Sequence, residues 1–126
     1  MRPYAGVTNL SISDDKKQIN WDSGGNGITI ICDRVHQAQL DEQQNLVIAL
    51  LGINDTPSEM VIYNSNGSTN KTLSGPKDFY FSYLTKHPEI GTAVVCSTDS
   101  PIDDWYDWYF SIDFRRGALF RQGPSY

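Results

Sequence analysis

The feature that most limits the fold of this chain is a rhythm of short apolar segments and turn signals. Runs rich in β-branched and aromatic residues recur, and clusters of Gly, Pro, Asn and Asp separate them about every 8–12 residues. Residues 34–43 and 100–108 are the only stretches that leave a helix open, and neither keeps apolar residues at helical spacing throughout. The sequence therefore predicts an all-β protein built from antiparallel hairpins.

The expected strands are short, and turn residues bound them. They are residues 7–13, 18–21, 28–32, 46–51, 60–63, 79–84, 92–97, 105–114 and 118–120, and the third could continue through Val35. Residues 24–27 are glycine-rich and tolerate positive φ, and Asn66–Gly67 is a marker of a tight hairpin. In 7–13, strict alternation places Val7 with Asn9 and Ser11.

A weak internal repeat refines the fold class. Residues 46–76 and 93–124 each read as an apolar strand, an Asp-Thr/Ser-Pro turn, a second strand, a glycine turn and a closing Gly-Pro. Residues 7–34 share the strand–turn rhythm, although any small β protein shows some of it. Strand repeats of about 40–50 residues are typical of propeller blades, and 126 residues are fewer than four blades need. We expect a single all-β domain over 1–126, with antiparallel meander sheets in a partial (half) β-propeller; a small β-sandwich is the alternative.

The charge balance restricts the partners. The chain carries 10 Lys and Arg against 15 Asp and Glu, a formal net charge of −5. Direct nucleic-acid binding needs a surplus of cations, so it is not expected. No apolar run approaches the length of a membrane span, and the N-terminus lacks the apolar core of a signal peptide. We therefore expect a cytoplasmic protein without a membrane partner.

No catalytic pattern stands out. His36 and His87 have no second ligand at metal-binding spacing, and no nucleophile or phosphate-loop motif is present. The sequence predicts no catalytic residue, no metal and no cofactor, and hence no enzyme. Cys32 and Cys96 lie in apolar runs and are expected to be buried reduced thiols, although a disulfide stays open.

The segment that combines acids with aromatics is the leading candidate for binding. On a strand, Trp105, Asp107 and Tyr109 would share one face, and Tyr106, Trp108 and Phe110 the other. Only one of these faces can be core, so the face with Asp107 is expected to be exposed, and surface Trp and Tyr are frequent binding anchors. The first-tier contact residues are Asp103, Asp104, Trp105 and Asp107.

Other acidic residues fall in predicted turns, where binding residues are often carried. This second tier consists of Asp14, Asp15, Asp41, Glu42, Asp55 and Glu59. An acidic and aromatic surface is suited to a basic protein partner and speeds its association.

The blade-like pattern of residues 46–76 and 93–124, with the acidic charge, resembles the bacterial immunity proteins of contact-dependent growth inhibition and related toxin–immunity systems. It is similar in particular to the immunity partner of an EndoU-type RNase toxin. The resemblance implies a protein that binds a cognate toxin, a basic nuclease, and neutralises it by occluding its active site or substrate groove. Two alternatives stay open from the residues: a small carbohydrate- or ligand-binding β module, and a small hydrolase with an acid pair.

Overall fold

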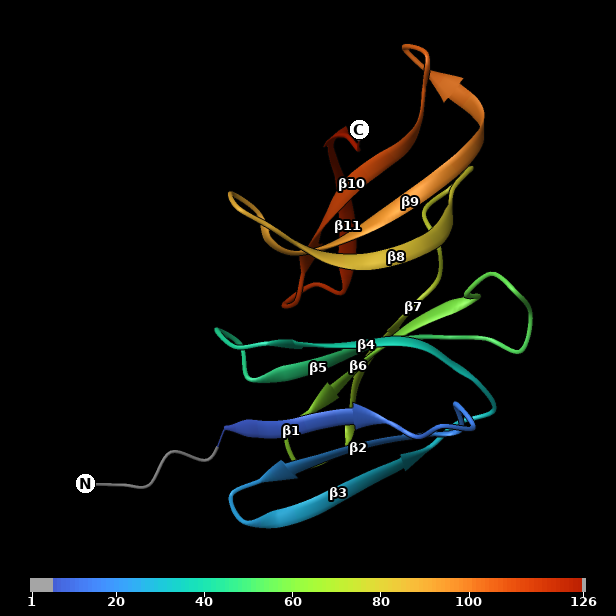
Figure 1. Cartoon of the computed structure of the whole chain (residues 1–126). Coiled ribbons are helices and arrows are strands. Elements are labelled where there is room, and N and C mark those ends of the chain that lie inside the picture. Colours follow the sequence, from blue (N-terminus) through green and yellow to red (C-terminus); the bar gives the residue numbers. More distant parts are fainter. Residues whose placement is uncertain (1–5, 126) are drawn as a thin grey trace.

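The computed structural model, which describes residues 6–125, consists of β-strands joined by turns and short loops (Figure 1). The strands are β1 Val7–Ile12, β2 Gln18–Ser23, β3 Asn26–Ile31, β4 Val35–Asp41, β5 Leu46–Leu51, β6 Glu59–Asn64, β7 Thr69–Leu73, β8 Tyr80–His87, β9 Gly91–Ile102, β10 Trp105–Asp113 and β11 Ala118–Pro124. The predicted all-β class is confirmed. The single domain predicted over 1–126 stays a prediction, and residues 1–5 and 126 lie outside the described part.

The strands form three antiparallel meanders that lie one on another. Sheet A has the order β1-β2-β3, sheet B β4-β5-β6-β7 and sheet C β8-β9-β10-β11. Sheet B lies between the other two, and the three sheets do not close into a barrel (Figure 1). This architecture is consistent with both the partial propeller and the small β-sandwich. The two copies of the sequence repeat correspond to β5–β7 and β9–β11, and the first unit corresponds to β1–β3.

Two apolar clusters hold the stack together, one on each side of sheet B. All six residues of β5 are buried: Val47, Ala49 and Leu51 contribute to the cluster with sheet A, while Leu46, Ile48 and Leu50 contribute to the cluster with sheet C. An uninterrupted apolar run fits a strand covered on both faces. In the first cluster, Trp21 also donates its indole N–H to the backbone oxygen of Ser65 at 2.8 Å.

Glutamine side chains of β4 join sheet B to the edge of sheet C. The amide of Gln37 donates to the backbone oxygen of Leu84 at 2.9 Å and accepts the N–H of the same residue at 2.7 Å. Gln39 donates to the backbone oxygen of Thr85 at 3.0 Å. These contacts pair backbone groups that an edge strand would leave open to another chain.

Two glycine turns make equivalent contacts between neighbouring sheets. A Cβ at Gly67, where φ is +93°, would lie 2.8 Å from Cγ2 of Ile28 in sheet A. A Cβ at Gly117, where φ is +68°, would lie 2.6 Å from Cδ of Lys71 in sheet B. Each turn therefore packs closely on the outer strand of the preceding sheet, and the repeat in the sequence has a counterpart in the packing.

Several local predictions were wrong. Residues 34–43, where a helix was left open and no strand was expected, contain strand β4, and β3 ends at Ile31, so its possible continuation through Val35 does not occur. In β1 the register shifts between Thr8 and Ser11, with Asn9 at φ 57°, so Val7 packs on the same side as Leu10. The turn expected at residues 99–101 lies inside β9, and the chain reverses at Asp103 and Asp104.

The two cysteines differ in their burial. Cys32 and Cys96 are both free; Cys96 is buried between sheets B and C, whereas Cys32 is half-buried beside the other cluster. Burial raises the pKa of the Cys96 thiol to about 12. Residues 6–125 contain no helix long and apolar enough to cross a membrane.

Candidate binding surface on the third sheet

The β9–β10 hairpin extends beyond the rest of sheet C. β8 pairs with β9 only as far as Ser97, whereas β9 continues to Ile102 (Figure 1). Asp103 and Asp104 both have positive φ, 50° and 69°, the pattern of a type I′ turn. We name the projecting end the acidic tip. Its residues are Asp99, Asp103, Asp104, Trp105 and Tyr106.

The acidic tip presents negative charge and aromatic surface to solvent. Asp99, Asp103 and Asp104 are exposed, and none of them takes part in the ion pairs formed among residues 6–125. Trp105 is 38% and Tyr106 55% exposed. Exposed carboxylates that form no ion pair with the described residues can attract a positively charged partner, and the two rings offer it apolar contact.

Below the tip, the side of sheet C that faces away from sheet B is lined with aromatic rings. We name this surface the tyrosine face; it consists of Tyr80, Tyr83, Tyr109 and Phe120. Val95 is paired with Tyr83 on one side and Tyr109 on the other, and it is fully buried although no sheet covers it. The ring of His87 lies edge-on to Tyr109, with centroids 4.9 Å apart.

Part of the predicted alternation is confirmed. Trp108 and Phe110 are in the core, and Asp107 and Tyr109 lie on the opposite face. Asp107 is exposed and accepts the hydroxyl proton of Ser97 at 2.6 Å. Strands β9 and β10 thus carry an exposed surface that is both acidic and aromatic.

The alternation fails at the start of β10. The register shifts between Trp105 and Asp107, and Trp105 pairs with Ile102, which packs against the core. Directly paired residues share a face, so Trp105 lies on the side of Ile102 rather than with Asp107. Tyr106, predicted to face the core, is exposed because the tip extends past the sheet.

Sequence reasoning missed Tyr80, Tyr83 and Phe120. Simple alternation groups Phe81 with Tyr83, but a register shift between them places Phe81 in the core and Tyr83 outside. The aromatic run 79–84 was the available signal, since one apolar strand face can account for only half of it.

An open hollow of about 900 Å³ lies between the tip and the edge of the tyrosine face. Its lining includes Lys77, Tyr80, Asp99, Pro101 and Arg121. The guanidinium of Arg121 lies over the ring of Trp108, 4.7 Å from its centroid. The hollow therefore combines charges of both signs with a tyrosine ring.

Four second-tier acids are in sheets A and B, not in the sheet that carries the tip. Asp14 and Asp15 are in the β1–β2 turn, Asp55 is in the β5–β6 loop and Glu59 begins β6. Asp15 accepts the hydroxyl proton of Ser13 at 2.6 Å, and this hydrogen bond lowers the pKa of its carboxyl group. Asp55 lies 3.9 Å from Arg34.

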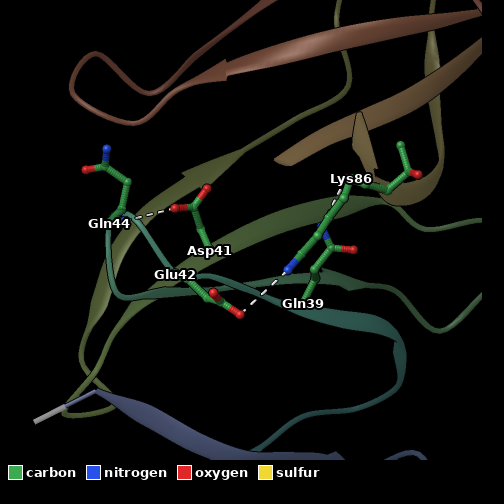
Figure 2. Close-up of polar contacts among 6 residues, drawn as sticks. Gln39, Asp41, Glu42, Gln44 and Lys86 are labelled. Carbon is green, nitrogen blue, oxygen red and sulfur yellow. Dashed lines mark hydrogen bonds and ion pairs between the residues drawn. The ribbon is translucent and has the colours of Figure 1, made fainter. Parts of the chain in front are cut away.

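The other two second-tier acids, Asp41 and Glu42, are in the β4–β5 turn (Figure 2). Asp41 is buried and accepts the backbone N–H of Gln44 at 2.9 Å, an arrangement that stabilises the turn. Glu42 lies 4.0 Å from Lys86 of β8, across the junction of sheets B and C. Local structure accounts for both contacts, and neither residue adjoins the tip.

Within the described part of the chain, no three His, Cys, Asp or Glu side chains converge as a metal site would require. Comparison of the chain with protein-family models, curated proteins and solved structures gave no match.

Proposed function

We propose that this chain is an immunity protein that binds a basic toxin, of the nuclease class, and neutralises it by covering its active site or substrate groove. The proposal assigns it no chemistry and places it in the cytoplasm, where such a toxin would act. The acidic tip is its contact region, with Asp107 at the base.

The observation that supports this proposal best is the tip itself. Three exposed carboxylates that form no ion pair among residues 6–125, and two exposed aromatic rings, project on the β9–β10 hairpin. A nuclease that binds RNA or DNA needs a cationic groove, and a projecting anionic hairpin has the charge and shape to enter one. Trp and Tyr are the residue types that most often dominate binding energy.

The proposal also fits the contrast between tip and scaffold. The strands that carry the tip continue into the core through Trp108 and Phe110, so the tip is held by buried packing. A pre-organised contact surface loses little conformational entropy on binding, which favours a tight complex.

The test is co-expression with the toxin domain encoded beside the gene for this chain, read out as protection of growth and as complex formation. We expect the wild type to protect, and Asp103→Asn/Asp104→Asn to weaken the complex at least tenfold and slow association at low salt. The matched control is Glu89→Gln, an exposed turn acid outside the candidate contact residues. No protection and no complex with wild-type protein would refute the proposal.

A further inference from the structure

The two ends of the stack differ in a way that the proposed function does not explain. Sheet B is covered on both faces, so the outer faces of sheets A and C are the two surfaces with no sheet upon them. The outer face of sheet A carries polar side chains apart from Ile31 at its edge, whereas the tyrosine face exposes Tyr80, Tyr83 and Phe120 by 43–47%. Tyr80 and Tyr83 lie on β8 and Phe120 lies on β11, the two edge strands of sheet C. Several exposed rings on one sheet face are typical of a contact surface.

Charges at the two ends of the same strand indicate what would cover it. β10 begins at the acidic tip, next to Asp103 and Asp104, and ends at the β10–β11 turn with Arg115 and Arg116. Both arginines are exposed; the Arg116 guanidinium lies 3.8 Å from Asp113, but its side chain remains 75% exposed. The β10–β11 turn has these two arginines against the single carboxylate of Asp113, while Glu89 lies in the neighbouring β8–β9 turn. Strand β10 therefore runs from a negative end to a turn of net positive charge, with aromatic rings between them.

Such a surface is complementary to itself in one orientation. When two identical faces pack about a two-fold axis with their strands aligned, those strands run either parallel or antiparallel. A parallel arrangement would place tip on tip, which brings like charges together. An antiparallel arrangement places the tip of each copy on the arginine turn of the other, and both contacts are attractive.

We propose that the tyrosine face binds the tyrosine face of a second copy of this chain, with the two β10 strands antiparallel. Asp103 and Asp104 of each copy then lie near the partner's Arg115 and the partner's Arg116. This inference does not rest on the proposed function. Because both use the acidic tip, a cationic protein that binds the tip competes with the second copy.

The size of the face sets the strength of the dimer. Four strands spaced about 4.8 Å apart, each about seven residues long, cover roughly 450 Å² per copy. A stable specific interface buries about 800 Å² per partner, so this dimer belongs to the weak class and depends on concentration. It therefore forms at high protein concentration and dissociates on dilution.

The first test is sedimentation equilibrium of the full chain over a wide concentration range at low salt. We expect a monomer–dimer equilibrium in which Tyr83→Ser and Phe120→Ser each raise the dissociation constant about tenfold. Ile31→Ser is the matched control, because Ile31 is 72% exposed on the outer face of sheet A. A wild type that stays monomeric at every concentration, or dimers unaffected by the face variants, would overturn the proposal; a monomer leaves the face available to an unlike protein.

The second test determines the orientation by reversing charges. Asp103→Lys/Asp104→Lys and Arg115→Glu/Arg116→Glu are each expected to be monomeric alone. Mixed together, they should form a heterodimer, since both tip–turn contacts become attractive, and the four substitutions in one chain should restore the homodimer. Circular dichroism checks that each variant folds. Failure of the mixture to associate would exclude the antiparallel arrangement.

Discussion

The outer faces of sheets A and C occupy equivalent places at the two ends of the stack but have opposite chemistry. On sheet A, Thr29 donates its hydroxyl to Asn20 at 2.9 Å and Asn9 donates its amide to Asp22 at 2.9 Å. On sheet C the corresponding surface is made of tyrosine and phenylalanine rings around a buried valine. A stack of sheets needs polar ends to stay soluble, as terminal repeats of solenoids show.

The difference shows which end the chain reserves for contact. Sheet A ends the stack with side chains that satisfy one another and water. Sheet C ends it with aromatic rings whose exposure to water is unfavourable, next to carboxylates that form no ion pair in the described part of the chain. The acidic tip and the tyrosine face therefore belong to one functional end of the molecule, and sheet A is its cap.

The largest expected change in stability tests which face of sheet C stabilises the fold. Phe81→Ala removes a ring that is 1% exposed between sheets B and C, and it should lower the free energy of unfolding by about 3–5 kcal/mol. Tyr83→Ala, on the other face of the same strand, should change it by less than about 1 kcal/mol. Urea denaturation measures both. Similar losses for the two would show that the tyrosine face is part of the stabilising core.

Alkaline pH should act on the inner side of sheet C. Burial raises the pKa of Cys96 from 9.0 to about 12, so its contribution to stability is complete below pH 9 and is lost as pH rises towards 12. The slope is about 1.4 kcal/mol per pH unit, or roughly 3 kcal/mol by pH 11. Tyr63, with a pKa raised by burial to about 12, acts in the same direction above pH 10. Unfolding curves of wild type and Cys96→Ala at pH 8 and 11 test this; an equal loss in both would assign the effect elsewhere.

Relieving the strained turn should separate stability from binding at the acidic tip. Asp104 has φ 69°, a conformation that glycine adopts without strain. Asp104→Gly should stabilise the fold by about 1 kcal/mol and weaken binding of a basic partner. Thermal unfolding and a binding titration give the two readings. Stabilisation with unchanged binding would remove Asp104 from the contact region.

The smallest effect comes from giving sheet A a face like that of sheet C. Asn20 and Thr29 are directly paired on its outer surface. Asn20→Val with Thr29→Tyr creates an aromatic–β-branched pair, which should add about 0.2–1 kcal/mol to stability. It should also promote self-association through sheet A, measured by sedimentation. A variant that stays as monodisperse as the wild type would show that exposed rings alone do not make a contact face.

The fold was predictable wherever burial repeats in the sequence. The apolar run 46–51 identifies β5, and the recurring turns identify the meanders, because these depend on local periodicity. Strand β4 was not predicted because only one of its faces is apolar and the other carries Gln37 and Gln39, which look like loop residues. The amides of these two residues hydrogen-bond to the backbone of sheet C, a contact that local sequence does not indicate.

The candidate site was partly predictable. Strand alternation was sufficient to place Asp107 and Tyr109 on an exposed face. Alternation misplaced Trp105 because a register shift lies between Trp105 and Asp107. It misplaced Tyr106 because the hairpin extends beyond strand β8, and the length of that extension cannot be inferred from the hairpin's own sequence. The six second-tier acids lie in turns and strand ends of sheets A and B, apart from the tip on sheet C, an arrangement that depends on how the meanders lie together.

The position of sheet B has a consequence for dynamics. β4 contacts strands of both outer sheets, so the three layers form a linear chain of nearest-neighbour contacts in which the middle layer couples the ends. Either outer sheet can open while the other stays docked, but opening sheet B exposes both clusters at once. Amide hydrogen exchange should therefore be slowest in β5 and β6, and the molecule should fray from its two terminal layers inward.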